Sequence, residues 1–330
     1  MQSENGNLKT QGKNLYLKKL LQSPVAGAMI AFILVFIIMS VTGKGIFLSG
    51  NNMMNIIRQG AVLSIVAIGQ TFVIITGGID LSVAPLISLS TVITASLITN
   101  NNVNWGLACL AALAACAALG VVNGILISYV KIPPIIATLA TSMAIQGISL
   151  LYSKGYGINL PTGHPLFKLI ARGKVAGFPV SGIFMIILYI VTFIILRYTK
   201  LGRVTYGLGG NSEAVYLSGI SVTKYKIAVY TISAAMAGLA GIVLTGLINS
   251  GHPYNGDGMD MNSIAAVVLG GASVAGGTGV IEGTLIGVFI LTMIENGLNM
   301  INMNVYLQMM IKGLIIVASI GLGSIRENKK

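Results

Sequence analysis

The stretch TGGIDLSVAPLISLS, residues 76–90, separates two strongly apolar runs and contains paired glycines, a carboxylate and a proline. Asp80 within it is one of only eight acidic residues in the chain. A bilayer accepts helices readily but tolerates irregular backbone only where protein or water covers it. The stretch therefore predicts a chain of membrane-crossing helices whose helical pattern is interrupted at a defined place.

The composition of the chain is that of a membrane protein. Of its 330 residues, 55% are hydrophobic and 8% are charged, and its mean hydropathy is +0.87. A soluble domain carries about 25% charged residues, so we expect an all-α integral membrane protein. A net charge of +12 would indicate nucleic acid in a soluble protein. Here we expect basic loops that contact membrane lipid, and no nucleic acid.

Ten apolar segments approach the roughly 20 residues that cross a bilayer. They lie near residues 24–42, 56–76, 82–99, 105–130, 134–152, 182–197, 225–249, 263–280, 283–300 and 305–323. Glycine or serine interrupts the third and the eighth, whose boundaries are the least defined. An even number of spans places both termini on one side. The chain then divides into an N-terminal tail (1–23), one transmembrane domain (24–325) and a C-terminal tail (326–330).

The distribution of Lys and Arg orients these spans. Thirteen lie in one set of connections and six in the other, which favours both termini in the cytoplasm. The inner set is Lys9, Lys13, Lys18, Lys19, Lys131, Arg197, Lys200, Arg203, Lys224, Lys226, Arg326, Lys329 and Lys330. The outer set is Lys44, Arg58, Lys154, Lys168, Arg172 and Lys174. Four of these six lie in the loop 153–181, which we expect to be an external docking surface.

The chain lacks the usual catalytic patterns. Its two histidines, His164 and His252, fall in predicted outer loops, and no His, Cys or carboxylate pair has metal-ligand spacing. A GxxxxGK[ST] phosphate loop is absent. Cys109 and Cys116 lie about 10 Å apart along one helix, beyond the reach of a disulfide, and are expected to be packing residues. We therefore expect no enzyme, no metal and no cofactor.

The segment RYTKLGRVTYGLGGNSEAVYLSGISVTKYK, residues 197–226, predicts a short cytoplasmic helix between basic flanks. Asn211 can cap it, Glu213 lies in its first turn, and Gly219 can end it. Its apolar side consists of Ala214, Val215, Leu217 and Ile220. Such a helix can insert into a groove on a soluble partner, or it can lie on the lipid surface. The residues by themselves leave both interpretations open.

Two stretches of the chain resemble each other. VIITGGIDLSV at 73–83 and AVVLGGASVAG at 266–276 each place a Gly-Gly pair after a β-branched apolar run. Corresponding breaks in two halves of a chain point to the centre of a transporter. The alternative is that such pairs are common among 42 glycines.

Three motifs carry a resemblance to a known family. GQTFVIITGGIDLSV (69–83), GRVTYGLGGNSEAVYLSGISVTKYKI (202–227) and SIAAVVLGGASVAGGTGVIEGTLIG (263–287) resemble permease subunits of bacterial carbohydrate ABC importers, the ribose-type branch. The similarity extends from about residue 24 to 325. It implies a ten-span permease of the plasma or inner membrane for ribose or a related monosaccharide. A cytoplasmic ATPase subunit, an extracytoplasmic sugar-binding protein and a second permease copy, as a homodimer, would complete the complex.

Other functions remain open beside this one. They are a permease for branched-chain amino acids, nucleosides or autoinducer-2, and an ion-coupled secondary carrier that would use Asp80. The branch often has glycine where this chain has Ala84 and Pro85. This departure predicts a stiffer turn after Asp80.

The resemblance also assigns candidate site residues. Within the coupling segment 198–224, the residues that would dock on the ATPase are Asn211, Ser212, Glu213, Ala214, Val215, Leu217, Ser218, Gly219 and Ile220. A sugar path at the dimer axis would be lined by small and hydroxyl side chains. The candidates are Thr76, Gly77, Gly78, Ser82, Ser88, Ser90, Asn123, Gly270 and Gly271.

The predicted topology places Asp80 at the cytoplasmic junction of spans two and three. There it would cap a helix that begins near Leu81, accepting a backbone N–H from around Val83. The alternative is a buried proton-relay acid.

Three further polar residues fall inside predicted spans nine and ten. Glu295 and Asn299, one turn apart, either line the path or find partners inside the helix bundle. Lys312 either pairs with Glu295 or extends to an interface.

Overall fold

The computed structural model describes residues 24–43, 45–161, 168–169 and 172–327. The N-terminal tail 1–23, Lys44, His164 and the last three residues of the C-terminal tail lie outside the described residues. The predictions made for them are therefore not addressed further.

The described chain is helical, which confirms the all-α membrane class. Seven helices are long and apolar enough to cross a membrane. They are α2 (Pro24–Thr42), α3 (Gly50–Ile75), α5 (Trp105–Ser128), α6 (Pro134–Ser153), α8 (Val180–Tyr198), α10 (Val222–Ile248) and α12 (Ile281–Met300). The other described helices are α4 (Val83–Thr99), α9 (Lys200–Leu217), α11 (Met259–Leu269) and α13 (Val305–Glu327). Each of the ten predicted segments overlaps one of these helices, while ten spans and cytoplasmic termini remain predictions.

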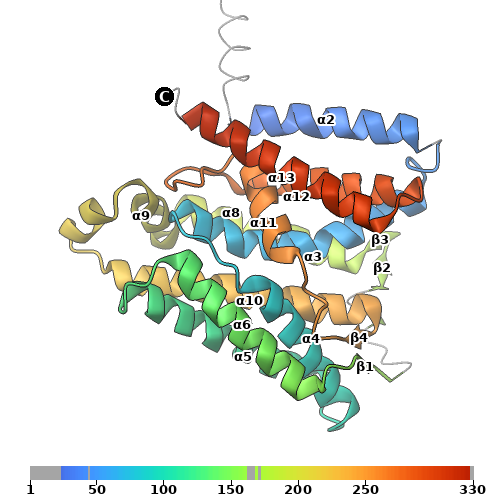
Figure 1. Cartoon of the computed structure of the whole chain (residues 1–330), viewed down its shortest axis with the longest axis horizontal. Helices are drawn as coiled ribbons and strands as arrows, with labels where there is room; N and C mark the ends of the chain where they lie inside the picture. Colours follow the sequence, from blue (N-terminus) through green and yellow to red (C-terminus); the bar gives the residue numbers. More distant parts are fainter. Residues whose placement is uncertain (1–23, 44, 162–167, 170–171, 328–330) are drawn as a thin grey trace, which may run out of the picture.

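The bundle has two distinct ends (Figure 1). α9 lies at one end, and the start of α2 and the end of α13 are on the same side. Two short antiparallel pairs lie at the opposite end: β1 (Ile158–Asn159) with β4 (Ser250–Gly251), and β2 (Lys174–Val175) with β3 (Phe178–Pro179). We refer to these as the α9 end and the strand end.

α10 packs against α3, α4 and α5 at the centre of the bundle. On α5, a Cβ at Gly120 would overlap the Tyr230 carbonyl, and one at Gly124 would overlap the Ile227 backbone. Membrane helices gain van der Waals contact when small residues let their backbones approach. The glycines of α5 therefore fix its close packing on α10.

The eighth predicted span is wrong in its extent. α11 ends at Leu269, and the predicted segment continues to residue 280 without helical structure. Eleven residues give a helix about 16 Å long, short of the roughly 30 Å hydrocarbon core. The break has a local cause, since Gly271, Gly276 and Gly277 all take positive φ, which a continuing helix cannot contain.

Candidate functional site

α9 consists of two helices joined at Asn211, whose backbone is non-helical (φ −161°, ψ 99°). The Asn211 Oδ1 accepts the Ala214 N–H at 2.9 Å, which confirms the predicted cap. Gly219 adopts a φ of +76° and its N–H donates to the Tyr216 carbonyl at 2.9 Å, which confirms the predicted end. The last helical residue is Leu217 rather than Ile220. Local signals located the second half of α9, whereas the helix over residues 200–210, expected as a basic flank, was not predicted.

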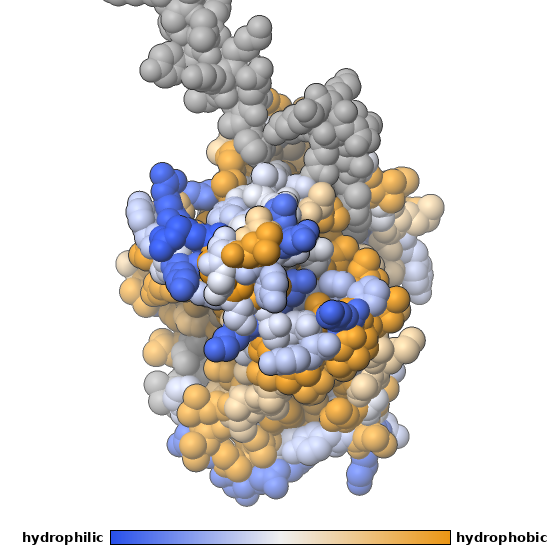
Figure 2. Space-filling model, turned by 90° about the vertical axis from the view of Figure 1, so that its left-hand side faces the viewer, coloured by the Kyte–Doolittle hydropathy of each residue, from blue (hydrophilic) through white to orange (hydrophobic). Residues whose placement is uncertain are grey.

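The second half of α9 projects an exposed apolar surface. Tyr216 and Leu217 are 69% and 77% exposed. Between the two halves runs a groove of about 520 Å³, lined by Arg203, Val204, Asn211, Val215 and Ile220 among others. Figure 2 shows this end of the molecule, where hydrophilic residues surround a small hydrophobic patch. Most of the predicted coupling residues are exposed here: Asn211, Ser212, Glu213, Ala214, Leu217, Ser218 and Gly219.

Three segments that are far apart in the sequence meet at backbone contact beneath α9. A Cβ at Gly209 would overlap the Ile75 carbonyl, and one at Gly276 would lie 2.7 Å from the Gly77 nitrogen. The Gly277 N–H donates to the Ile75 carbonyl at 2.8 Å. We call Gly77, Gly209, Gly276 and Gly277 the glycine junction. The junction brings the stretch 73–83 directly against the end of the similar stretch 266–276.

A side-chain contact from α9 supports the same junction. The Tyr206 hydroxyl donates to the Gly279 carbonyl at 2.8 Å. Burial, and then the charge of Glu282, raise the pKa of Tyr206, so the hydroxyl keeps the proton that it donates. Sequence reasoning assigned no role to Gly209, Gly276 or Gly277. The available signal was the repeated Gly-Gly pair, which also occurs at 209–210 and 276–277.

Asp80 is fully buried beside α10. Its Oδ1 accepts the Ser82 N–H at 2.9 Å and the Ser82 hydroxyl at 2.6 Å. Its Oδ2 accepts the Ser233 hydroxyl of α10 at 2.8 Å. The Gln70 side-chain amide donates to the Asp80 carbonyl at 3.3 Å, so the chain after α3 turns back into the bundle.

The cap predicted for Asp80 differs in detail from the one in the structure. α4 begins at Val83 with Ser82 as its N-cap, and the bonded N–H belongs to Ser82 rather than to Val83. Asp80 lies between α3 and α4 as predicted, but it is fully buried and is also bonded to α10. The turn after Gly77 (φ +75°) directs the chain inward, and tertiary bonds replace the local cap.

The predicted path residues occupy helix contacts within the chain. Ser82, Ser88, Ser90 and Asn123 are fully buried. Asn123 donates to the Ser82 hydroxyl, Ser90 donates to the Gly238 carbonyl, and Ser88 accepts the Gly256 N–H. The Thr76 hydroxyl donates to the Val73 carbonyl. Gly78 lies against the Tyr230 hydroxyl, and Gly270 packs on Gly283. Gly77 is exposed, and Gly271 is partly exposed. The structure therefore joins Ser82 and Asn123 to Asp80 but presents few of these residues at a surface.

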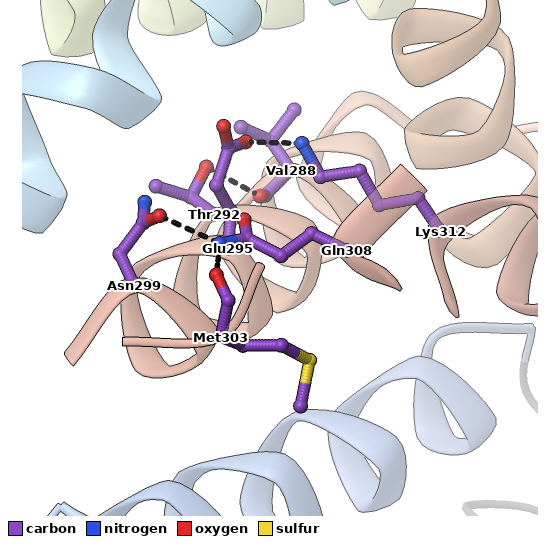
Figure 3. A network of polar contacts seen from close by, with 7 residues as sticks. All are labelled: Val288, Thr292, Glu295, Asn299, Met303, Gln308 and Lys312. Atoms are coloured by element: carbon purple, nitrogen blue, oxygen red, sulfur yellow. Dashed lines mark hydrogen bonds and ion pairs between the residues drawn. The ribbon is translucent and has the colours of Figure 1, made fainter. Parts of the chain in front are cut away.

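Glu295 and Asn299 of α12 find their partners on α13 (Figure 3). The Lys312 Nζ lies 3.1 Å from the Glu295 Oε2, which favours the ion pair over the alternative that Lys312 extends to an interface. The Gln308 side-chain amide donates to the Asn299 Oδ1 and to the Met303 carbonyl, both at 2.9 Å. The Glu295 side chain nevertheless remains 47% exposed.

One cation of the predicted outer docking loop is engaged within the chain. Arg172 donates to the Leu247 carbonyl at the end of α10. Lys154 and Lys174 are exposed. Arg172 therefore holds the loop against α10, and the two lysines remain accessible.

The chain is similar to known permeases over most of its length. Residues 52–320 match the family described as the branched-chain amino acid transport system / permease component. The ribose import permease protein RbsC of Bacillus subtilis (strain 168) is 38% identical, covering 95% of this chain and 96% of that protein. RbsC of Escherichia coli (strain K12) is 39% identical, covering 92% and 93%. The D-allose transport system permease protein AlsC of the same organism is 34% identical, covering 84% of each. No solved structure matches the chain.

Proposed function

This chain belongs to the family described as the branched-chain amino acid transport system / permease component, and we propose that it carries ribose or a closely related monosaccharide into the cell. It is the permease subunit of a sugar ABC importer and a multi-pass membrane protein. In the proposed complex, two copies form the path, a separate subunit hydrolyses ATP, and an external binding protein delivers the sugar.

The observation that carries the coupling role is the exposed, capped second half of α9. A helix lying on lipid would bury Tyr216 and Leu217 in the bilayer. The groove beside these residues would then have no binding partner. A helix that inserts into a partner instead presents an apolar tip, with the groove and Arg203 beside it for further contact. We therefore favour docking on a cytoplasmic ATPase over an interfacial role.

The glycine junction supplies a route for coupling. Because α9 touches both interhelical loops through backbone atoms, a displacement of α9 must displace them as well. ATP-driven movement of the docked partner would thus bias the loops before α4 and α12. Coupling would then require that the contacts of α9 with these loops differ between the two states of the transporter.

Uptake of labelled ribose tests this function. Cells that lack their own ribose importer are supplied with the chain, its partner ATPase and the binding protein, and uptake is measured with unlabelled allose or galactose as competitor. We expect ribose uptake that persists in the presence of an uncoupler and stops when the ATPase is inactivated. Loss of uptake on uncoupling alone would indicate a secondary carrier, and no ribose uptake despite membrane expression would exclude this sugar.

A further inference from the structure

The segment 251–258, between β4 and α11, descends into the bundle along α4. A Cβ at Gly251 would overlap the Thr91 carbonyl, and one at Gly256 would overlap the Ala84 carbonyl. The Gly256 N–H also donates to the Ser88 hydroxyl at 2.9 Å. The segment therefore runs antiparallel to α4, from its middle to its first turn.

The depth reached by this segment follows from the length of α4. Thr99, the last residue of α4, donates to the Asn159 carbonyl of β1 at the strand end. Ala84 lies fifteen residues earlier, which corresponds to about 22 Å along the helix. Gly256 is consequently far inside the bundle, near the depth at which α4 and α11 both begin. Backbone without helical bonds is tolerated at such depth only inside protein or beside a water-filled cavity.

Two side chains of this segment, and one in the first turn of α11, are not enclosed by protein. Tyr254 is 49% exposed, Asp257 is exposed, and Met261 in the first turn of α11 is 48% exposed. A carboxylate that faces hydrocarbon at depth costs at least about 2.5 kcal/mol. Since Asp257 is covered neither by protein nor by an ion-pair partner among the described residues, water is the environment that accommodates it.

Neighbouring helices provide an independent indication of water on this flank. α12 and α13 both pack against α11, and they expose part of the Glu295–Lys312 pair, at 47% and 24% of the two side chains. The outer surfaces of α2, α5 and α8 are apolar by contrast, with Ile37, Leu110 and Ile190 more than half exposed. Partly exposed charge within the bundle thus lies on the helices beside α11, although α13 also exposes apolar side chains such as Met310 and Leu314.

We propose that residues 254–261 line the sugar route, and that Tyr254 and Asp257 contact the sugar hydroxyls. The inference rests on the proposed function, which supplies the sugar. The Asp257 carboxylate accepts hydroxyl protons, and the Tyr254 hydroxyl both donates and accepts, so the two groups suit a polyhydroxylated ligand. The Thr91 hydroxyl accepts the His252 N–H and the Gln146 side-chain amide donates to the Pro253 carbonyl, so the backbone just before Tyr254 is held in place.

Thiol labelling tests the exposure to water directly. In a chain whose two cysteines are replaced by serine, Tyr254→Cys and Asp257→Cys are introduced singly into the assembled transporter in liposomes. A charged, membrane-impermeant thiol reagent is then added from the side of the strand end. We expect labelling at least about tenfold faster than at Ile190→Cys on the outer face of α8, because thiolate forms where water reaches the sulfur.

The substrate contact has a second readout. Excess ribose should slow labelling of Asp257→Cys under turnover, and Asp257→Asn should lower the maximal uptake rate roughly tenfold, as expected when a hydrogen bond to a charged group is weakened. Labelling no faster than at Ile190→Cys would overturn the inference. Fast labelling without sugar protection and with unchanged uptake by Asp257→Asn would overturn the contact role. Neither result would affect the proposed function, which fails only if the unmodified chain does not transport the sugar.

Discussion

At the scale of single residues, Asp80 illustrates a buried acid held by hydroxyl groups. It accepts three hydrogen bonds, from the Ser82 N–H, the Ser82 hydroxyl and the Ser233 hydroxyl. No cation forms an ion pair with it among the described residues. The three bonds tie the turn before α4 to the middle of α10. This arrangement is consistent with a structural role and does not require proton transfer.

The residue-scale prediction concerns the substitution Asp80→Asn. Asparagine keeps an acceptor for Ser82, and the Ser233 hydroxyl can turn to accept from its amide, so transport should remain within about threefold of normal. Asp80→Leu should instead destabilise the protein by about 1–3 kcal/mol for each orphaned buried group. Thermal unfolding in detergent and sugar uptake measure the two effects. Complete loss of uptake by a well-folded Asp80→Asn variant would indicate a functional acid.

The Glu295–Lys312 pair is the second arrangement at this scale. Its two side chains come from adjacent helices and meet within the bundle, and each lies several residues inside its helix. The pair joins the two helices, although its partial exposure to water limits its contribution to stability to about 0–1 kcal/mol. The pair therefore orients α13 on α12 even though part of it faces water.

At the scale of elements, α9 acts as a unit with the two loops that it touches. Its first half contacts them through Gly209, and its second half carries the exposed tip. α11 is short and ends just before one of these loops, and the turn before α4 follows the other. A small shift of α9 would therefore displace segments that lie directly against it.

The element-scale prediction compares two adjacent glycines of α9. A Cβ at Gly209 would overlap the Ile75 carbonyl, whereas one at Gly210 would meet nothing within 4 Å. Overpacking of a close contact costs about 1–3 kcal/mol. We therefore expect Gly209→Ala to lower sugar uptake roughly tenfold while the complex still hydrolyses ATP.

Gly210→Ala is the matched control, because it adds the same methyl group one residue away. Its uptake and ATP hydrolysis should both stay close to those of the unmodified complex. Equal uptake by the two variants, with equal amounts in the membrane, would show that the junction does not transmit the movement.

At the scale of the whole molecule, surface character separates the two ends from the sides. Exposed cations such as Lys200, Arg203 and Lys224 lie at the α9 end, and Lys154 and Lys174 lie at the strand end. The sides of the bundle between them are largely apolar. Charge at both ends and apolar sides suit a protein that spans a bilayer and meets different partners on its two sides.

The whole-molecule prediction is that the purified chain by itself hydrolyses no ATP. It contains no GxxxxGK[ST] loop to hold the phosphates, so hydrolysis should begin only when the partner ATPase is added. Release of phosphate from the chain in detergent or liposomes is the measurement. Hydrolysis by the single subunit, above that of a preparation from cells without it, would contradict the assignment of ATP hydrolysis to a separate subunit.

The sequence by itself determined the features that arise within one or two helical turns. Apolar runs located the membrane-crossing helices, and Asn211 and Gly219 delimited the tip of α9, while the Glu295–Lys312 pair was one of two alternatives that the sequence left open. These signals are short-range, because caps and helical bonds join residues at most a few positions apart. Within the described residues they were sufficient to define the class of the protein.

Only the tertiary structure decided what the interruptions of the helices pack against. Asp80 was expected to cap a local helix at the junction of spans two and three but is also bonded to Ser233 of α10, and the glycine junction joins residues 77, 209 and 276. The sequence did not predict the inward course of 251–258 along α4 either, since nothing near Gly251 and Gly256 distinguishes them from other loop glycines. The physical reason is the same in each case. Close backbone approach depends on which distant segments pack together, and a sequence window that covers one partner contains no information about the other.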